Sequence, residues 1–285
     1  MRVNSHHHLW RYTHTQYEWI DDRMRVLRKD FLPSHLRKGI DAAGVRATVV
    51  IQARSTLEET TWLLELASKC DAIRGVVGWA PILSGEFASI LDHLRAEPLL
   101  RGLRHVVQGE PIGFLDRTDF NRGIARLRGT KLVYDILISA RQLDEAIRFV
   151  DRHPRQIFVL DHIGKPDIAG NGFAAWSAAI RELARRENVV CKLSGMVTEA
   201  DWEHWSPRLL YPYFETVLEA FGSTRLMVGS DWPVLTVACS YTQWWQVVSD
   251  WLTPLSTAER RDIEGGVASR IYRLDLNHSN AEESK

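Results

Sequence analysis

Cysteine is scarce in this chain of 285 residues, with Cys70, Cys191 and Cys239 far apart in the sequence. An odd and sparse set does not form a disulfide framework, and the lack of a CxxC pair excludes a zinc knuckle. No segment reaches the ~18 consecutive apolar residues of a membrane span. The N-terminus also lacks the apolar stretch of a secretory signal. These absences predict a cytoplasmic protein.

An excess of charge of either sign is missing as well. The 36 Lys and Arg residues balance the 36 Asp and Glu residues. A balanced chain has no global field that attracts nucleic acid or an anionic membrane. We therefore expect neither as a partner, and we expect a monomer or a homodimer that acts on a small molecule.

What the sequence does have is a series of apolar runs of strand length, separated by segments with helical periodicity. Strands are predicted at 2–8, 46–52, 73–80, 102–107, 131–138, 157–163, 188–194 and 225–231. Helices are predicted at 33–44, 57–70, 87–97, 119–129, 140–154, 173–188, 211–222, 241–252 and 258–274.

Strands that alternate with helices predict parallel pairing and right-handed crossovers. Eight such units in a chain of this length predict an α/β fold, a closed (β/α)8 TIM barrel in a single domain over residues 1–275. Residues 276–285 are predicted to be a polar C-terminal tail. The alternative is an open doubly wound sheet, against which the lack of GxGxxG after the first strand counts.

The predicted first strand ends in three histidines, His6, His7 and His8. Side-chain alternation puts Asn4, His6 and His8 on one face and turns His7 away. A purification tag is the other explanation of HHH, but the flanks RVNS and LW differ from the Gly/Ser context of a tag. We therefore interpret the histidines as native groups at a strand end.

The other predicted strand ends are also rich in polar and aromatic side chains. In a barrel, the chemistry lies at these C-terminal ends. Each residue alone has a structural explanation, such as helix capping by an aspartate, but their convergence on one rim favours a site. The strand ends carry Gln52, Trp79, Arg104, His105, Gln108, Tyr134, Asp135, Asp161, His162, Lys192, Ser194, Asp231 and Trp232.

The stretches SHHHLW, LDHIGKP and MVGSDWPV resemble the amidohydrolase superfamily. More narrowly, they resemble its branch of sugar-lactone hydrolases, of the L-fuconolactonase and L-rhamnonolactonase type. The resemblance covers roughly residues 2–275 and rests on His6 and His8 as an HxH pair, on His162 and on Asp231. It implies a (β/α)8 barrel, a hydrolytic reaction and a water activated by Asp231.

Two positions depart from the superfamily pattern. Many members carry a Lys or His metal ligand at the end of strand five, where this chain offers Tyr134 or Asp135. A bridged two-metal site is therefore not expected. Asn4 stands where relatives commonly have Asp, so a carboxylate that orients a ligand histidine is expected to be missing.

Lactone hydrolysis needs a base for the water, stabilisation of the oxyanion and a proton for the leaving alkoxide. Asp231 is the predicted base. His6, His8 and His162 are predicted to stabilise the oxyanion, either as donors themselves or by holding one divalent ion together with Asp231. Zinc is the first choice for such a ligand set. Lactones are activated esters, so a metal-independent lactonase is the alternative.

The predicted rim is aromatic and poor in charge, which favours a neutral sugar lactone that is opened to an aldonic acid in carbohydrate catabolism. Flat aromatic faces pack against the C–H face of a sugar ring, and Arg and Gln side chains bind its hydroxyls. The predicted substrate-binding residues are Trp10, Gln52, Trp79, Arg104, Gln108 and Trp232.

Three other functions stay open at this point. A 2-pyrone-4,6-dicarboxylate lactonase would need several arginines that converge on two carboxylates, and Arg54 and Arg104 are the candidates near the mouth. A metal-dependent decarboxylase of the same superfamily is the second alternative. The third is a sugar-binding barrel that has lost its activity.

Overall fold

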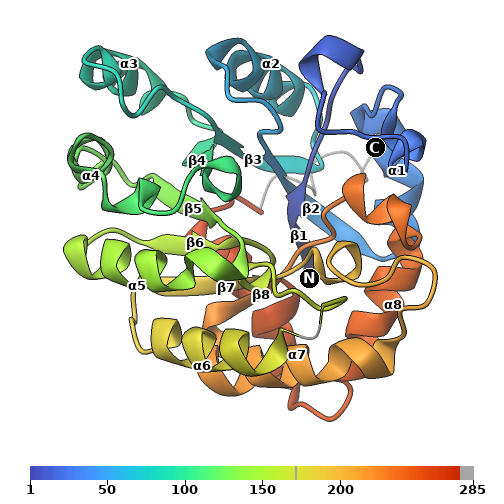
Figure 1. Ribbon diagram of the computed structural model, residues 1–285. Helices are drawn as coiled ribbons and strands as arrows, with labels where there is room; N and C mark the ends of the chain where they lie inside the picture. The colour runs from blue at the N-terminus through green and yellow to red at the C-terminus, as the bar shows by residue number, and fades with distance from the viewer. Residues whose placement is uncertain (171, 277–285) are drawn as a thin grey trace.

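The structure, a computed structural model, describes residues 1–170 and 172–276. Its strands form one parallel sheet in the order β1 to β8 (Figure 1). They are β1 (Arg2–His7), β2 (Val45–Ile51), β3 (Ile73–Gly78), β4 (Leu100–Val106), β5 (Val133–Leu137), β6 (Phe158–Leu160), β7 (Val189–Leu193) and β8 (Leu226–Val228). The predicted barrel is confirmed, and the open doubly wound sheet is excluded. Beyond Leu276, the predicted tail lies outside the described residues.

The barrel closes between β1 and the residues that follow β8. His7 forms a parallel bridge with Trp232, and the His8 N–H donates to the Trp232 carbonyl at 2.6 Å. The N–H groups of Ser230 and Asp231 donate to the His6 carbonyl at 3.1 and 2.9 Å. These bonds place the chain after β8 directly beside the predicted histidines.

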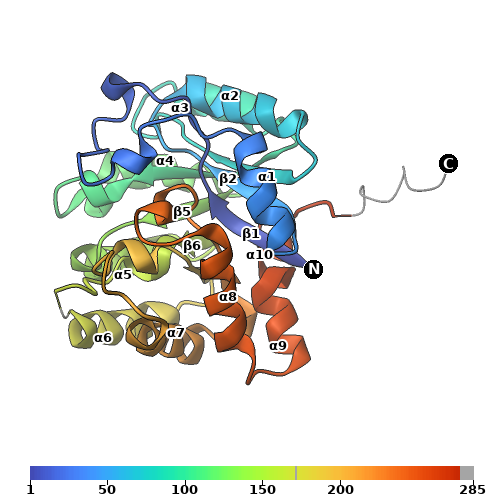
Figure 2. The same cartoon turned by 90° about the vertical axis from the view of Figure 1, so that its right-hand side faces the viewer.

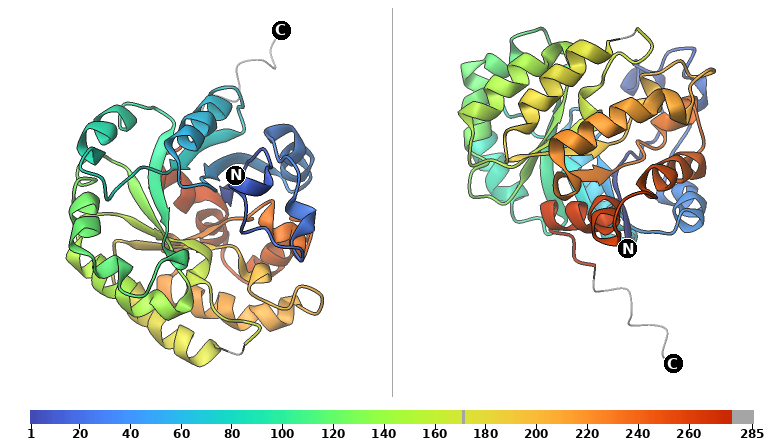
Figure 3. Two further views of the ribbon diagram at one scale, coloured as in Figure 1. Left: turned by 45° about the horizontal axis from the view of Figure 1, so that its top comes forward. Right: turned by 90° about the horizontal axis from the view of Figure 1, so that it is seen from below.

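Helices lie around the outside of the sheet (Figures 1 and 3). They are α1 (Pro33–Ala42), α2 (Leu57–Ser68), α3 (Phe87–Leu94), α4 (Thr118–Ala125), α5 (Leu143–Arg152), α6 (Phe173–Ala184), α7 (Pro207–Phe221), α8 (Tyr241–Leu252), α9 (Thr257–Arg261) and α10 (Val267–Ile271). Within the described part of the chain, no helix is both long and apolar enough to span a lipid bilayer.

The helix predicted at 258–274 is interrupted between α9 and α10 by a π-helical segment, Asp262–Gly266. A Cβ at Gly265 would lie 2.4 Å from the carbonyl oxygen of Met1. The start of β1 therefore packs directly against this segment (Figure 2). Helical periodicity is a local pattern, so it does not reveal this contact between the start of β1 and residues far along the chain.

Apolar side chains fill the barrel interior below the mouth. Valines from β1, β2, β3, β5, β6 and β7 pack with Val267, Ala268 and Tyr272 of the C-terminal segment. Branched residues are typical of such interior layers. The C-terminal segment thus closes the floor, and the polar strand ends are left at the opposite, open end.

Candidate active site

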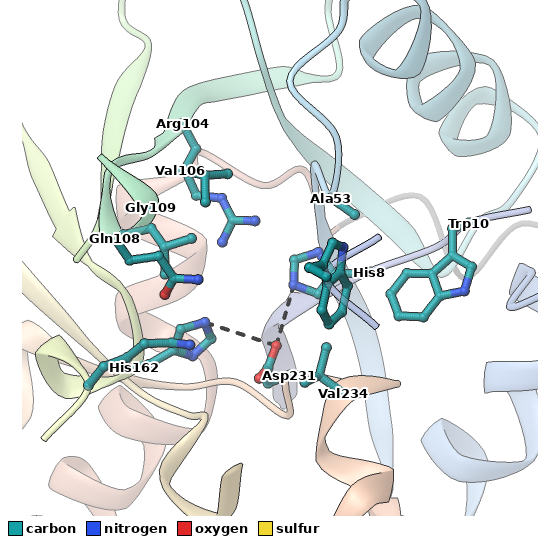
Figure 4. A pocket seen from close by; sticks show the side chains of 13 residues that line it. His8, Trp10, Ala53, Arg104, Val106, Gln108, Gly109, His162, Asp231 and Val234 are labelled. Atoms are coloured by element: carbon teal, nitrogen blue, oxygen red, sulfur yellow. Dashed lines mark ion pairs between the residues drawn. The ribbon is translucent and has the colours of Figure 1, made fainter. Parts of the chain in front are cut away.

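A cavity of about 310 Å³ opens at the C-terminal ends of the strands (Figure 4). Six of the residues predicted for the site line it, and seven more join them. The predicted ones are His8, Trp10, Arg104, Gln108, His162 and Asp231. The additional ones are Trp19, Ala53, Val106, Gly109, Leu137, Lys165 and Val234.

His6 and His8 converge, and His7 turns away from them. The Nε2 atoms of His6 and His8 are 3.1 Å apart, and the ring centroid of His6 lies 4.4 Å from that of His162. His7 instead contacts the Thr48 hydroxyl at 3.1 Å on the other face of the sheet. His6 is fully buried beneath the cavity, and His8 lines it.

Asn4 does not share the face of His6 and His8, so the predicted grouping of the three is wrong. The pairing of β1 with β2 shifts register between Asn4 and His7. Such an irregularity re-aims the side chains that follow it. Val3 packs into the interior cluster, and Asn4 holds the end of β8, accepting from the Ser230 N–H at 2.8 Å and donating to its hydroxyl at 2.9 Å.

One carboxylate oxygen of Asp231 lies among the three imidazoles. Its Oδ1 is 3.3 Å from Nε2 of His8, 3.7 Å from Nε2 of His6 and 4.0 Å from Nε2 of His162. Burial raises the pKa of Asp231, but the neighbouring His162 and His8 outweigh burial and hold that pKa below its usual 3.8. Asp231 is therefore a carboxylate at neutral pH.

The facing imidazoles are held in fixed orientations. His8 Nδ1 donates to the Ile51 carbonyl at 2.9 Å, so its Nε2 presents a lone pair to the cavity. His162 Nδ1 lies 2.9 Å from the Ser194 hydroxyl. Burial lowers the pKa of His162 to about 4 and that of His6 well below 6.5, so both rings are neutral at pH 7.

These donors fit one divalent ion. His6 Nε2, His8 Nε2 and Asp231 Oδ1 are separated by 3.1, 3.3 and 3.7 Å. Neighbouring ligand atoms of a tetrahedral zinc with bonds of ~2.0–2.1 Å lie roughly 3.3 Å apart. Neutral imidazoles and an ionised carboxylate are also the protonation states that a metal needs. His162, with His6 and Asp161, belongs to a second, overlapping group of possible ligands.

A carboxylate does stand behind a ligand histidine, so its predicted absence is wrong. Asp161, which directly follows β6, places Oδ1 at 3.4 Å from Nδ1 of His6. An outer carboxylate commonly orients a ligand histidine. Here the Lys192 ammonium group also lies 3.3 Å from the same Nδ1, so both groups hold the His6 ring. The residue at position 4 does not decide whether such a carboxylate is present, because the partner of His6 comes from across the barrel.

Asp161 belongs to a buried network of four charged side chains. It contacts Arg104 and Lys192 at 2.9 Å each, and Lys192 contacts Asp135 at 2.5 Å. Tyr272, from the floor segment, donates to the same Asp135 at 2.8 Å. All four charged residues are at most 3% exposed, and their charges cancel. Of the two candidates at strand five, Asp135 is thus held inside this network.

Three predicted substrate contacts do not line the cavity. Gln52 is buried and accepts from Arg104 at 3.1 Å, so it supports that arginine. Trp79 lies beyond the end of β3 at Gly78, and its indole donates to His105 at 3.4 Å. Trp232 packs edge-on against Phe31. Strand periodicity does not predict the direction of side chains once the strand has ended.

Trp19 is a cavity residue that the strand-end analysis missed. It comes from the long loop between β1 and α1, and its ring stands edge-on to Trp10 at 6.0 Å. Loops of a barrel commonly carry its binding residues. The sequence signal that could have indicated Trp19 is its place in the loop that follows the strand with the HxH pair.

The predicted strand 157–163 ends at Leu160, and a left-handed turn follows it. His162, Ile163, Gly164 and Lys165 have φ values of 53°, 50°, 73° and 46°. The left-handed conformation costs roughly 1–2 kcal/mol for each non-glycine residue. The ion pair of Lys165 with Glu199, at 3.1 Å and partly exposed, contributes at most about 1 kcal/mol. This ion pair is therefore too weak to account for the turn.

Comparison with known proteins gives consistent matches. Residues 3–274 match the family model described as Amidohydrolase. The chain is 42% identical to an L-fucono-1,5-lactonase of Burkholderia multivorans, over 96% of both chains. It is 34% identical to an L-fucono-1,5-lactonase of Burkholderia ambifaria, again over 96% of both. The crystal structure of an amidohydrolase from Burkholderia multivorans with bound zinc superposes with a TM-score of 0.94 at 42% identity, covering 96% of this chain and 100% of that chain.

Proposed function

The chain belongs to the amidohydrolase family, and we propose that it is a lactonase that opens a sugar lactone of the L-fucono-1,5-lactone type to the aldonate. The observation that carries the proposal is the ionised Asp231 among three imidazoles at the wall of an open cavity. The two lactonase relatives support the choice of substrate class.

Asp231 takes the proton from the attacking water as the water oxygen bonds to the lactone carbonyl carbon. The carbonyl oxygen becomes an oxyanion. When the Ser194 hydroxyl donates to Nδ1 of His162, the Nε2–H of His162 faces the cavity and donates to this oxyanion. The ring C–O bond then breaks, and Asp231 returns the proton to the leaving alkoxide.

His8 has a different role from His162, because its Nδ1 proton is engaged by Ile51 and its inward nitrogen carries a lone pair. His6, His8 and Asp231 would hold one divalent ion. Such an ion, when bound, polarises the lactone carbonyl as a Lewis acid and lowers the pKa of a bound water. Asp161 and Lys192, at 3.4 and 3.3 Å from Nδ1 of His6, hold the ring in place.

The two sides of the cavity differ in polarity, which suits a neutral polyol ring. Trp10, Ala53 and Val234 lie on one side, and Arg104 and Gln108 lie on the other (Figure 4). The apolar side packs against the C–H face of the ring, and the polar side binds hydroxyls. Arg104 is already neutralised by Asp161, which disfavours a dicarboxylated pyrone.

The test is a panel of lactones assayed with a pH indicator, because each turnover releases one proton. We expect hydrolysis of several five- and six-membered aldonolactones, 6-deoxy forms included, because an apolar pocket discriminates one methyl group by only ~1–3 kcal/mol. Hydrolysis of 2-pyrone-4,6-dicarboxylate alone would replace the proposal by the pyrone lactonase. Binding of aldonates without acid release from any lactone would favour a binding protein.

The metal is tested separately by elemental analysis of protein purified without added metal. We expect at most about one equivalent, because the two groups of possible ligands within the described residues share His6 and so compete for one ion. Exhaustive chelation should lower the rate, and zinc should restore it. Full activity after chelation would favour the metal-independent alternative.

A further inference from the structure

We propose that Lys165 is a further substrate-contacting residue, whose ammonium group binds the carboxylate that lactone opening creates. This inference rests on the proposed function and deepens it, because it concerns the product of that reaction. Nothing in the described contacts ties Lys165 to the buried charge network that holds Arg104.

The left-handed turn brings Lys165 to the cavity. Lys165 and His162 are three residues apart, and the Lys165 N–H donates to the His162 carbonyl at 2.8 Å. Both side chains line the same cavity. The turn is held at its sides, because the Trp176 indole donates to the Ile163 carbonyl at 2.8 Å and the Ala140 N–H donates to the Lys165 carbonyl at 3.2 Å. Backbone strain of this kind is typical of functional sites.

The partner of Lys165 leaves its charge available. Glu199, in the loop after β7, contacts Nζ at 3.1 Å, and the two side chains are 25% and 20% exposed. An ion pair that water reaches is held weakly, typically by no more than about 1 kcal/mol. Arg104, the other strong cation of the cavity wall, is 3% exposed and bound by Asp161. Lys165 is thus the cation that can turn to a new anion.

The reaction creates such an anion. A neutral lactone and water give a hydroxy acid, which loses a proton at neutral pH and becomes an aldonate. As the new C–O bond forms and the ring C–O bond breaks, negative charge collects on the former carbonyl group. A cation beside that group stabilises the charged species more than the neutral lactone.

The experiment compares two variants of Lys165 with matched variants of Lys131, an exposed lysine that also has a left-handed backbone, with φ 68°. Lys165→Met removes the charge, and Lys165→Gly removes the charge while relieving the backbone. Lys131→Met and Lys131→Gly make the same changes away from the cavity. The readouts are KM and kcat for L-fucono-1,5-lactone, the inhibition constant of L-fuconate and the melting temperature.

Both Lys165 variants should weaken L-fuconate inhibition and lower kcat by ~10–100-fold, the effect of one charge-assisted hydrogen bond, with little change in KM. Lys165→Gly should melt no lower than Lys165→Met, so its loss of activity is not a loss of folding. Glu199→Gln should strengthen product inhibition, because it frees Lys165. The Lys131 variants should match the unaltered protein.

Product inhibition within twofold of the unaltered protein in both Lys165 variants would overturn the inference. Equal changes in kcat and in L-fuconate inhibition in the Lys131 variants would also overturn it. They would show that substitution at a left-handed position is enough to cause the change. If the unaltered protein hydrolyses no lactone, the proposed function fails instead. Calorimetric titration with L-fuconate then decides the role of Lys165, since retained binding in both variants would refute it.

Discussion

At the scale of single residues, His7 and His8 are neighbours with opposite environments. His8 faces Asp231, whereas His7 is buried against Thr48, and burial lowers the pKa of His7 to about 3. His8→Gln should lower kcat/KM by at least about 100-fold, because it removes an inward nitrogen of the site. His7→Gln keeps a polar partner for Thr48 and should stay within about threefold. Steady-state kinetics measure kcat/KM for both variants. Equal losses of kcat/KM in the two variants would contradict the assignment of His8, and not His7, to the site.

Asp231 is the residue whose removal should affect the chemical step most directly. Asp231→Asn keeps the size of the side chain but cannot accept the proton, so kcat should fall by ~10²–10⁴-fold. In the unaltered protein, the pKa of Asp231 lies below 3.8, so the base is ionised at neutral pH and is lost only as the pH falls through that low value. A rate for Asp231→Asn within about threefold of the unaltered protein would move the base elsewhere.

The sequence predicts which residues meet at the mouth better than how they contact one another. His8, His162 and Asp231 follow from alternation and from the position of strand ends in a barrel. The register shift in β1 arises from its pairing with β2, and the contact of Asp161 with His6 arises across the barrel. Neither leaves a local pattern in the sequence.

At the scale of elements, all eight predicted strands are present, but the ends of β6 and β8 come earlier than the apolar runs suggest. The run 157–163 continues through Ile163, which is buried in the left-handed turn and not in the sheet. An apolar residue indicates burial whether it lies in a strand or in a turn, so the apolar run cannot locate the end of β6.

The start of α2 carries a buried carboxyl group that affects stability. Glu59 accepts from the N–H groups of Ala53 and Arg54 at 2.9 and 2.7 Å, and Ala53 lines the cavity. Burial raises the pKa of Glu59 from 4.5 to about 7, despite these two hydrogen bonds. The folded protein therefore binds this proton more tightly than the unfolded chain, and its contribution to stability falls as the pH rises from 4.5 to about 7.

Glu59→Gln should remove this pH dependence while keeping an oxygen for the two N–H groups. Its free energy of unfolding, relative to the unaltered protein, should rise between pH 4.5 and pH 8 by up to about 3 kcal/mol. Urea denaturation at both pH values measures the free energy of unfolding of the two proteins. Their difference isolates Glu59, because every other titrating group is common to both proteins. A constant difference would show that Glu59 is ionised in the folded protein throughout this range.

At the scale of the whole molecule, a series of contacts between buried polar and charged side chains connects the floor of the barrel to its mouth. Tyr272 from the C-terminal segment contacts Asp135, Lys192 joins Asp135 to Asp161, and Asp161 reaches His6. The apolar runs predict the strands, yet they do not reveal that a lysine on β7 lies between one aspartate on β5 and another that directly follows β6. Such a network depends on the closure of the barrel.

Because Lys192 is shared by two buried carboxylates, its loss should be severe. Lys192→Met should lower the free energy of unfolding by ~3–5 kcal/mol, since two carboxylates would face each other in the interior. Asp135→Asn combined with Lys192→Met removes the unpaired charge and leaves Asp161 bound to Arg104. The double variant should therefore be more stable than Lys192→Met alone. Urea denaturation of the four proteins gives the coupling energy, and effects that add within about 0.5 kcal/mol would show that Lys192 and Asp135 act independently.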